Sequence, residues 1–536
     1  MKFKSSIICA LAATCTILPF TGGQQVVANT PANLTASAQE EVSHMYTLDF
    51  NNSAYTQETY TLNGQSVAVR AYRNIVYVQK PTSVKQQSMN IFIPEAYFSN
   101  GSINGYTKDT APIFMPNGVG GYLPGSAGEP SENDPMTKGP NAILTALSKG
   151  YVVAAPAIRG RTTVGDDGTT YVGKAPAFIV DYKAAVRYLR HNARQLPAGD
   201  TEKIISNGTS AGGALSALLG VTGNAKEYEP YLNAIGAAQE RDDIFASSVY
   251  CPITNLEHAD MAYEWMFHGV NHYYMAMWQL QDLAARGKSK QALSGEPPQA
   301  IDANAANNPM QSKQELFMTD EEIAISKVLK DAFPTYVNSL FLKDSTGKRL
   351  TLDDKGEGSF QDYIKGKYME SAQDALNKGI DISSATWVKV NDGKVIDVDL
   401  AEYAKVATRM KAAPAFDKLD MSSAENDEFG TDSNSPNHFS RISAEHTSTP
   451  GAMADEATIR LLNPMNFIGT AKTAQHYRIR HGAIDRDTTL AIPAILALKL
   501  AENGVDVNFY SPWNRGHGGD YDLPELFDWI DSIAKP

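Results

Sequence analysis

The chain has 536 residues, of which 43% are hydrophobic and 20% are charged, as in an ordinary globular protein with a full core. This length predicts one large domain with an insertion, or two domains. The formal net charge of −13 argues against nucleic acid or an anionic membrane surface as a partner.

The first residues have the three parts of a secretory signal peptide. Lys2 and Lys4 precede an apolar run at 7–20, and small residues end the polar segment that follows at 26–28. This pattern predicts cleavage after Ala28 and secretion of the mature chain. An uncleaved membrane anchor is the alternative, but the apolar run is shorter than the about 20 residues of a membrane-spanning helix.

Cysteine is rare in this chain. Cys9 and Cys15 lie within the predicted signal peptide, so the mature chain keeps Cys251 alone. No internal disulfide is expected, and no cluster of Cys and His has the spacing of a zinc site. Cys251 lies in an apolar segment, which favours a buried structural cysteine over a nucleophile.

Strands and helices are predicted to alternate up to residue 254. Strands are expected at 67–72, 89–94, 113–116, 151–156, 203–207 and 245–253, and helices at 142–147, 178–190 and 214–219. The alternation resumes after residue 463, with strands at 476–480 and 505–510 and helices at 492–502 and 524–534. This order predicts a mostly parallel sheet covered by helices on both faces.

Residues 255–463 interrupt this alternation. Helices are expected there at 273–285 and 315–333, together with a hairpin at 387–398 that turns at Asn391-Asp392-Gly393-Lys394. The sequence therefore predicts one α/β domain in two parts, 29–254 and 464–536, after a signal peptide at 1–28. The insertion between the two parts is expected to be mainly helical.

The segment Gly208-Thr209-Ser210-Ala211-Gly212 joins the strand at 203–207 to the helix at 214–219. A serine on such a tight turn adopts a strained backbone conformation that lifts its hydroxyl clear of the sheet. The flanking glycines are required because side chains there would collide with the neighbouring strand and helix. This predicts Ser210 as a nucleophile, with an ordinary glycine-rich turn as the alternative.

A neutral serine is a weak nucleophile and needs a base that is itself oriented by an acid. In α/β-hydrolases these residues follow later strands, in the order serine, acid, histidine. Asp485 follows the strand at 476–480, and His517 follows the strand at 505–510 between glycines. Ser210, Asp485 and His517 are therefore the predicted catalytic triad, in an α/β-hydrolase fold.

Two neighbours compete with these assignments. His481 lies at the end of its strand, before the acid, and a structural role is expected for it. Asp487 competes for the acid position, but the spacing of Asp485 from Gly482 matches the turn that presents this acid.

An oxyanion hole needs two backbone N–H groups directed at the developing negative charge. Ala211, directly after the nucleophile, is expected to supply one. The second is expected from the glycine-rich segment 116–122, at Gly118 or Val119. The predicted mechanism is ester hydrolysis through an acyl-enzyme, and it needs no metal and no cofactor.

The chain resembles the bacterial tannases (tannin acyl hydrolases), which are α/β-hydrolases with a large lid inserted before the strand that carries the acid. The resemblance covers most of the mature chain and rests on the segments 117–122, 208–213, 411–417, 422–426, 485–487 and 516–519. It implies that the insertion at 255–463 is a lid and that esters of gallic acid and hydrolysable tannins are the substrates. It also implies that Lys411, Glu425 and Asp487 bind the galloyl hydroxyls, a role that suits two carboxylate acceptors and one cationic donor.

Three other functions are compatible with parts of the sequence. A broader phenolic-ester carboxylesterase of the feruloyl type would keep the triad without needing Lys411, Glu425 and Asp487 together. A prolyl-oligopeptidase-like peptidase has the same order of catalytic residues, but the chain lacks the N-terminal repeats of a propeller. A catalytically silent binding protein would be expected to have lost a member of the triad.

Overall fold

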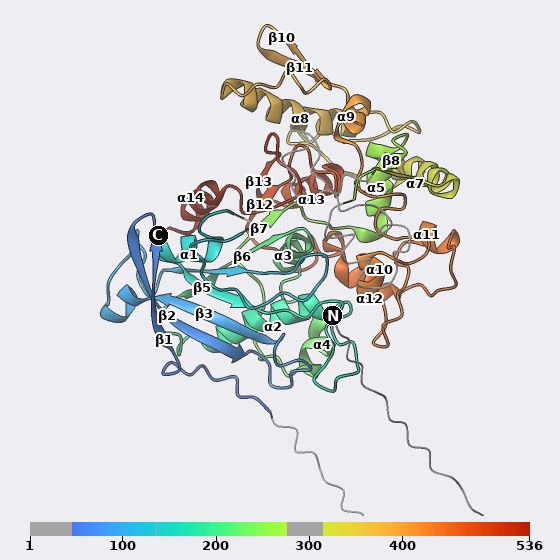
Figure 1. Ribbon diagram of the computed structural model, residues 1–536. Coiled ribbons are helices and arrows are strands. Elements are labelled where there is room, and N and C mark those ends of the chain that lie inside the picture. Colours follow the sequence, from blue (N-terminus) through green and yellow to red (C-terminus); the bar gives the residue numbers. More distant parts are fainter. Residues whose placement is uncertain (1–44, 136, 276–314, 536) are drawn as a thin grey trace, which may run out of the picture. The chain divides into compact units, whose positions relative to one another are not determined.

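The computed structural model describes residues 45–135, 137–275 and 315–535 (Figure 1). The predicted signal peptide at 1–28 lies outside the described residues, as does most of the helix predicted at 273–285. Among the described residues, no helix is long and apolar enough to cross a membrane.

A nine-stranded sheet in the order β1-β2-β3-β5-β4-β6-β7-β12-β13 forms the centre of the fold. Strands β1, β2, β3 and β5 pair antiparallel, whereas every pair from β5 through to β13 is parallel. The strands are β1 Thr56–Leu62, β2 Gln65–Val76, β3 Ser88–Pro94, β4 Pro112–Pro116, β5 Val152–Pro156, β6 Asp200–Thr209, β7 Ala246–Tyr250, β12 His476–Arg480 and β13 Asp506–Tyr510. The mostly parallel sheet predicted from the sequence is confirmed.

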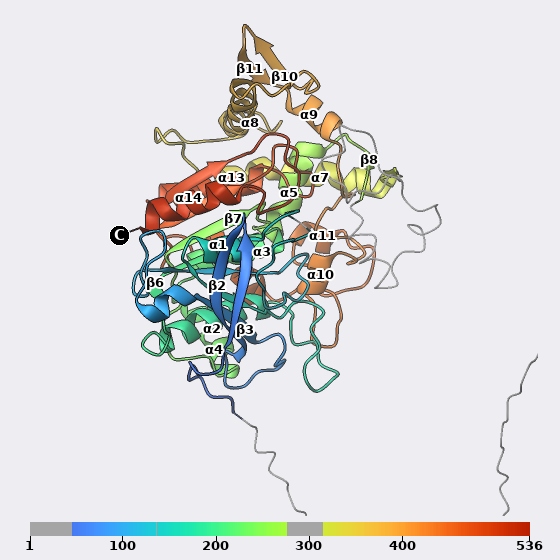
Figure 2. The ribbon, with the colours of Figure 1, turned by 60° about the vertical axis from the view of Figure 1, so that its left-hand side comes forward.

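Helices from both parts of the α/β domain cover the sheet (Figures 1 and 2). Helix α1 packs against α14, and α2 packs against α3. Their bounds are α1 Ala142–Ser148, α2 Ala177–His191, α3 Ala211–Val221, α13 Ala491–Glu502 and α14 Leu523–Ala534. Strands β5 and β7 are buried over their whole length, as expected for parallel strands with both faces covered.

The described residues between β7 and β12 lie outside this sheet, although the two strands are direct parallel neighbours. This region contains α5 Leu256–Phe267, β8 His272–Tyr273, β9 Leu316–Phe317, α7 Asp320–Ser339, α8 Ser359–Asn377, β10 Val388–Asn391, β11 Lys394–Val398, α9 Leu400–Ala407, α10 Ala424–Glu428, α11 Arg441–Glu445 and α12 Glu456–Leu462. Figure 2 shows α8, α9 and the β10–β11 hairpin grouped together. The hairpin was predicted correctly, while the boundaries at 255 and 463 stay a prediction.

Two helix starts in this region differ from expectation. Tyr273 belongs to β8, which pairs with β9, so the helix expected from 273 does not begin there and that expected from 315 begins later. Helix α7 starts at Asp320, because the hydroxyl of Thr319 accepts the Glu322 N–H and the Glu322 carboxylate accepts the Thr319 N–H. This capping box fixes the first turn of the helix.

One contact joins the hairpin region to the loop after β13. The ring centroids of Trp387 and Trp513 lie 5.3 Å apart, and Trp387 also meets Tyr403 edge-on. Aromatic pairs of this kind contribute about 0.5–1.5 kcal/mol beyond the area that they bury. Trp513 precedes His517 by four residues, so the hairpin region supports the loop that carries the predicted base.

A buried ion network holds α2 to the segment before β7. Lys183 Nζ lies 2.7 Å from one oxygen of Asp242, and Arg187 Nε donates to the other at 2.8 Å. The side chains of Lys183 and Asp242 are fully buried. Such a pair is costly to break, because removal of one partner leaves the other charge buried and uncompensated.

Asp242→Asn should therefore lower the free energy of unfolding by about 3–5 kcal/mol. The exposed i,i+4 pair of Lys327 and Asp331 on α7 provides a matched control, for which Asp331→Asn should cost at most about 1 kcal/mol. Urea denaturation followed by circular dichroism measures both values. Equal losses in the two variants would contradict the structural importance of the buried network.

Candidate active site

Ser210 occupies the turn between β6 and α3, with φ 60° and ψ −122°. This backbone conformation is strained for a residue with a side chain, at a cost of about 1–3 kcal/mol. A Cβ atom at Gly208 would lie 2.2 Å from the carbonyl oxygen of Gly212, and one at Gly212 would lie 2.6 Å from that of Val119. The predicted reason for these two glycines is thus confirmed: the backbones approach too closely for side chains.

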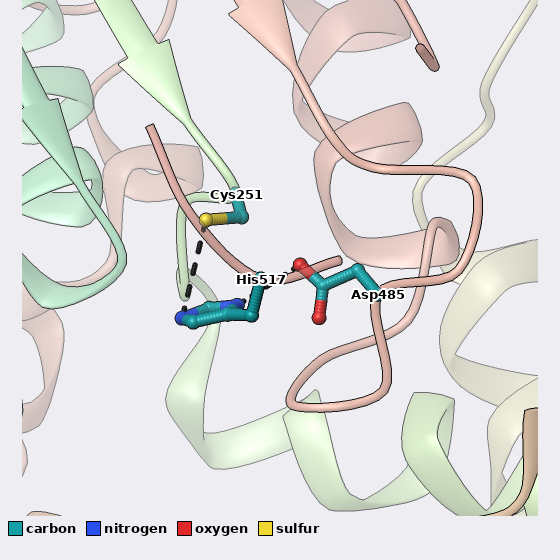
Figure 3. Close-up of side chains that lie close together, drawn as sticks. All are labelled: Cys251, Asp485 and His517. Carbon is teal, nitrogen blue, oxygen red and sulfur yellow. Dashed lines mark hydrogen bonds and ion pairs between the residues drawn. The ribbon is translucent and has the colours of Figure 1, made fainter. Parts of the chain in front are cut away.

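His517 and Asp485 form a hydrogen-bonded pair, with Nδ1 of the imidazole 2.9 Å from Oδ2 of the carboxylate (Figure 3). Asp485 follows β12 and His517 follows β13, two adjacent parallel strands whose carboxyl ends lie at the same edge. The N–H of Asp485 donates to the carbonyl of Gly482 at 3.0 Å, which closes the predicted turn. The other carboxylate oxygen, Oδ1, accepts the N–H of Asp487 at 2.9 Å.

The loop that carries His517 packs against the residue before the serine, but the serine makes no hydrogen bond to the pair among the described residues. Ser210 is anchored by its N–H, which donates to the Tyr250 carbonyl at 2.9 Å. A Cβ at Gly519 would lie 1.9 Å from Thr209 Oγ1, so the loop carrying His517 packs directly against the residue before Ser210. Within the described residues, no hydrogen bond joins Ser210 to His517. Catalytic hydrogen bonds are often long in a free enzyme and tighten when substrate binds.

The charges of the pair shift both pKa values. Burial alone would raise the pKa of Asp485, but the positive charge of His517 outweighs it, and the pKa falls to about 2. Burial alone would lower the pKa of His517, but the negative charge of Asp485 raises it well above 6.5. Asp485 is therefore ionised and holds the imidazole with Nδ1 as the donor.

His481 shares the neighbourhood of Asp485 but stays neutral. Its Nδ1 lies 3.7 Å from Asp485 Oδ2, beyond hydrogen-bond distance, and the side chain is fully buried. Burial lowers its pKa to about 4. Of the two histidines near the acid, His517 is the one that makes the hydrogen bond.

The predicted oxyanion-hole donors differ in their existing contacts. Ala211 is the first residue of α3, where helix N–H groups have no partner within the helix. The N–H of Val119 donates to Asn117 Oδ1 at 3.2 Å, whereas Gly118 is exposed. Asn117 Nδ2 in turn donates to the Gly212 carbonyl at 3.0 Å and fixes this loop beside α3. Because the Val119 amide already has an acceptor, the geometry favours Gly118 as the second donor.

The three residues expected to bind galloyl hydroxyls are all buried. Lys411 forms an ion pair with Asp487, and its ammonium lies 4.1 Å from the ring centroid of Phe416. Burial raises the pKa of Glu425, an effect that the charge of Lys411 opposes. The second oxygen of Asp487 lies 3.4 Å from His517 Nε2. The structure thus brings Lys411, Asp487 and His517 together, and the charges of Lys411 and Asp487 act on Glu425.

One neighbour of the site was not predicted. Cys251 is buried, as expected, but its sulfur lies 3.9 Å from His517 Nε2 (Figure 3). The residue follows β7 with φ 37°, and its sulfur donates to the Gly518 carbonyl at 3.5 Å. Its position one residue after a strand between β6 and β12 is the signal in the sequence that could have indicated this contact.

A strained serine between strand and helix, with an Asp–His pair after the last two strands of a mostly parallel sheet, defines an α/β-hydrolase. Residues 124–281 match BD-FAE, an α/β-hydrolase family. A tannase from Fusobacterium nucleatum is 48% identical and superposes with a TM-score of 0.83, over 91% of this chain and 100% of that one. The chain belongs to the tannase (tannin acyl hydrolase) family.

Two structures of a tannin acyl hydrolase, one in complex with ethyl gallate and one with 3,4-dihydroxybenzoate, are also similar. Each is 44% identical with a TM-score of 0.81, over 91% of this chain and 99% of that one. No curated protein sequence matches the chain.

The elevated pKa of His517 should depend on Asp485. Titration of the imidazole protons by nuclear magnetic resonance should give a pKa for His517 above 6.5 in the wild type. The pKa should be lower in Asp485→Asn, because the negative charge beside the ring is lost. The folded state holds this proton more tightly than the unfolded chain. The pair therefore stabilises the fold below pH 6.5, and this contribution disappears as the pH rises through the folded-state pKa.

His258 provides an internal control for this titration. It is buried beside Tyr336, and burial lowers its pKa to about 4. Its titration should be the same in both proteins. An unchanged pKa of His517 in Asp485→Asn would contradict the assigned role of this carboxylate.

Proposed function

We propose that the protein is a secreted serine esterase that hydrolyses galloyl esters of tannins and simple gallate esters to release gallic acid. The observation that carries this proposal is the buried Lys411–Asp487 ion pair, whose free carboxylate oxygen lies 3.4 Å from His517 Nε2. This arrangement places groups that can bind phenolic hydroxyls directly beside an Asp–His pair that can serve in acyl transfer. The ethyl gallate and 3,4-dihydroxybenzoate bound in the two similar tannin acyl hydrolase structures support the same substrate class. The signal-peptide pattern at 1–28 supports secretion.

In this mechanism Ser210 Oγ attacks the ester carbonyl while Nε2 of His517 takes its proton. The amides of Ala211 and Gly118 stabilise the negative charge of the tetrahedral intermediate. The imidazolium then gives its proton to the departing alcohol, and water, activated by the same nitrogen, releases gallic acid from Ser210. Asp485 orients His517 throughout. Because His517 must start neutral, hydrolysis should slow as the pH falls below its pKa.

Recognition of the acyl group rests on Lys411, Glu425 and Asp487. The two carboxylates accept hydrogen bonds from ring hydroxyls, and the lysine donates to a phenolic oxygen. An ester without these hydroxyls would leave buried polar groups unpaired, so it is expected to react far more slowly. A general phenolic esterase would not show this preference.

Hydrolysis of methyl gallate should be much faster than that of methyl benzoate or methyl ferulate. Ser210→Ala should lower the rate on methyl gallate by at least about 10⁴-fold, because no nucleophile remains. The rate of hydrolysis of each ester is measured by chromatography of the free acid that it releases. Similar rates on the three esters would refute the galloyl specificity and indicate a general phenolic esterase. Full activity in Ser210→Ala would refute the nucleophile.

Glu425→Gln should selectively weaken turnover of methyl gallate. Loss of a charged hydrogen-bond acceptor corresponds to about ten- to a hundredfold in kcat/KM, whereas slow hydrolysis of methyl benzoate should be unchanged. Glu445→Gln, at an exposed glutamate of α11, is the matched control and should leave both rates as they are. An equal loss on both esters in Glu425→Gln would indicate a general structural defect instead of lost hydroxyl recognition.

A further inference from the structure

Tyr263, on α5, joins the two segments of the chain that meet at the Lys411–Asp487 ion pair. Its hydroxyl donates to the Arg486 carbonyl at 2.7 Å and accepts the Met410 N–H at 3.1 Å. These two residues directly precede the two members of the ion pair. The side chain of Tyr263 is fully buried, and the mechanism proposed above gives it no task.

The ring of Tyr263 is held by contacts that do not involve its hydroxyl. It packs edge-on against Phe416, with ring centroids 6.0 Å apart, and the Arg409 guanidinium lies 5.4 Å from its centroid. Burial raises the pKa of Tyr263, so the phenol keeps its proton and remains a hydrogen-bond donor. The two hydrogen bonds of the hydroxyl therefore start from a fixed point.

Each of the two segments also has an anchor of its own. On one side, the N–H of the aspartate in the ion pair donates to Asp485 Oδ1 at 2.9 Å. On the other side, Arg409 Nε donates to the Lys411 carbonyl at 2.6 Å, and Nη1 of the same guanidinium donates to Glu264 of α5 at 3.0 Å. The Tyr263 hydroxyl differs from these anchors because it bonds to both segments at once. It therefore sets their separation.

We propose that Tyr263 is a positioning residue for recognition of the galloyl ring. Its hydroxyl sets the spacing of Lys411 and Asp487, and thereby the selectivity for esters that carry ring hydroxyls. This inference rests on the proposed function, which assigns that ion pair to the substrate. Without the hydroxyl, the carbonyl and the N–H that it binds lose this buried partner, and the two segments are free to shift relative to each other. The hydrogen bond of the Asp–His pair does not involve Tyr263, so hydrolysis of an ester without ring hydroxyls is affected less.

Tyr263→Phe removes the hydroxyl and keeps the ring. The ratio of kcat/KM for methyl gallate to that for methyl benzoate should fall about tenfold, as expected for the loss of one or two neutral hydrogen bonds. The loss should appear mainly as a higher KM for methyl gallate, because ring hydroxyls are bound in the ground state and in the transition state alike. Both esters are measured on one preparation, so the ratio does not depend on the fraction of folded protein.

Tyr228→Phe is the matched control. Tyr228 is also fully buried, but its hydroxyl donates to the Leu461 carbonyl of α12 at 2.6 Å, so its removal should leave the ratio as in the wild type. An unchanged ratio in Tyr263→Phe, or an equal loss on both esters, would overturn the positioning role while the wild type still prefers methyl gallate. A wild type that hydrolyses both esters alike would refute the proposed function and this role with it.

A double-mutant cycle with Lys411→Met tests whether Tyr263 acts through the ion pair. Lys411→Met alone should lower the ratio, because the donor to the phenolic oxygen is lost. Adding Tyr263→Phe should then change the ratio by less than about twofold, since two substitutions that affect one interaction are not additive. The same loss from Tyr263→Phe in both backgrounds would show that the hydroxyl acts elsewhere, and would overturn the proposal.

Discussion

The site depends on how closely the backbone at the carboxyl edge of the sheet can be packed. Gly208 lets the turn at Ser210 close against α3, Gly212 lets α3 lie against the loop at 117–119, and Gly519 lets the loop after β13 lie against Thr209. A methyl group at any of the three would lie within 2.6 Å of a neighbouring atom. The strain of Ser210 is sustained because the surrounding sheet and helices fix both of its flanks.

Parallel strand order then determines which side chains can meet. Strands β6, β7, β12 and β13 are neighbours in this order, so the residues that follow them reach a common edge from distant parts of the chain. Ser210, Cys251, Asp485 and His517 each follow one of these four strands. The segments outside the sheet add Lys411 to this edge, through its ion pair with Asp487.

The sequence predicts the part of this arrangement that local rules govern. The glycine pattern around Ser210, the strand before it and the turn that presents Asp485 are short-range features, and the strands and helices predicted for the two parts of the α/β domain lie within a few residues of the observed ones, whereas most helices of the insertion were not predicted. The ion pair of Lys411 with Asp487 joins residues far apart in the chain, and periodicity carries no information about such a pair. Lys411 and Glu425 were therefore identified only through the resemblance to the tannases. From the sequence pattern alone they would be interpreted as ordinary surface charges. The start of α7 was misplaced although Thr319 and Glu322 form a local capping signal, because residues 316–317, assigned to the helix, pair with the distant strand β8 instead.

His517 is surrounded by electron-rich groups, and this has two consequences. Asp485 raises the pKa of the imidazole, which strengthens the base but also increases the fraction that is protonated at a given pH. Asp487 and Cys251 lie on the other side, near the nitrogen that the proposed mechanism uses as the base. Under the proposed function, ring hydroxyls that engage Asp487 would remove one competitor for that nitrogen, and binding of a galloyl ring would therefore help to free the base.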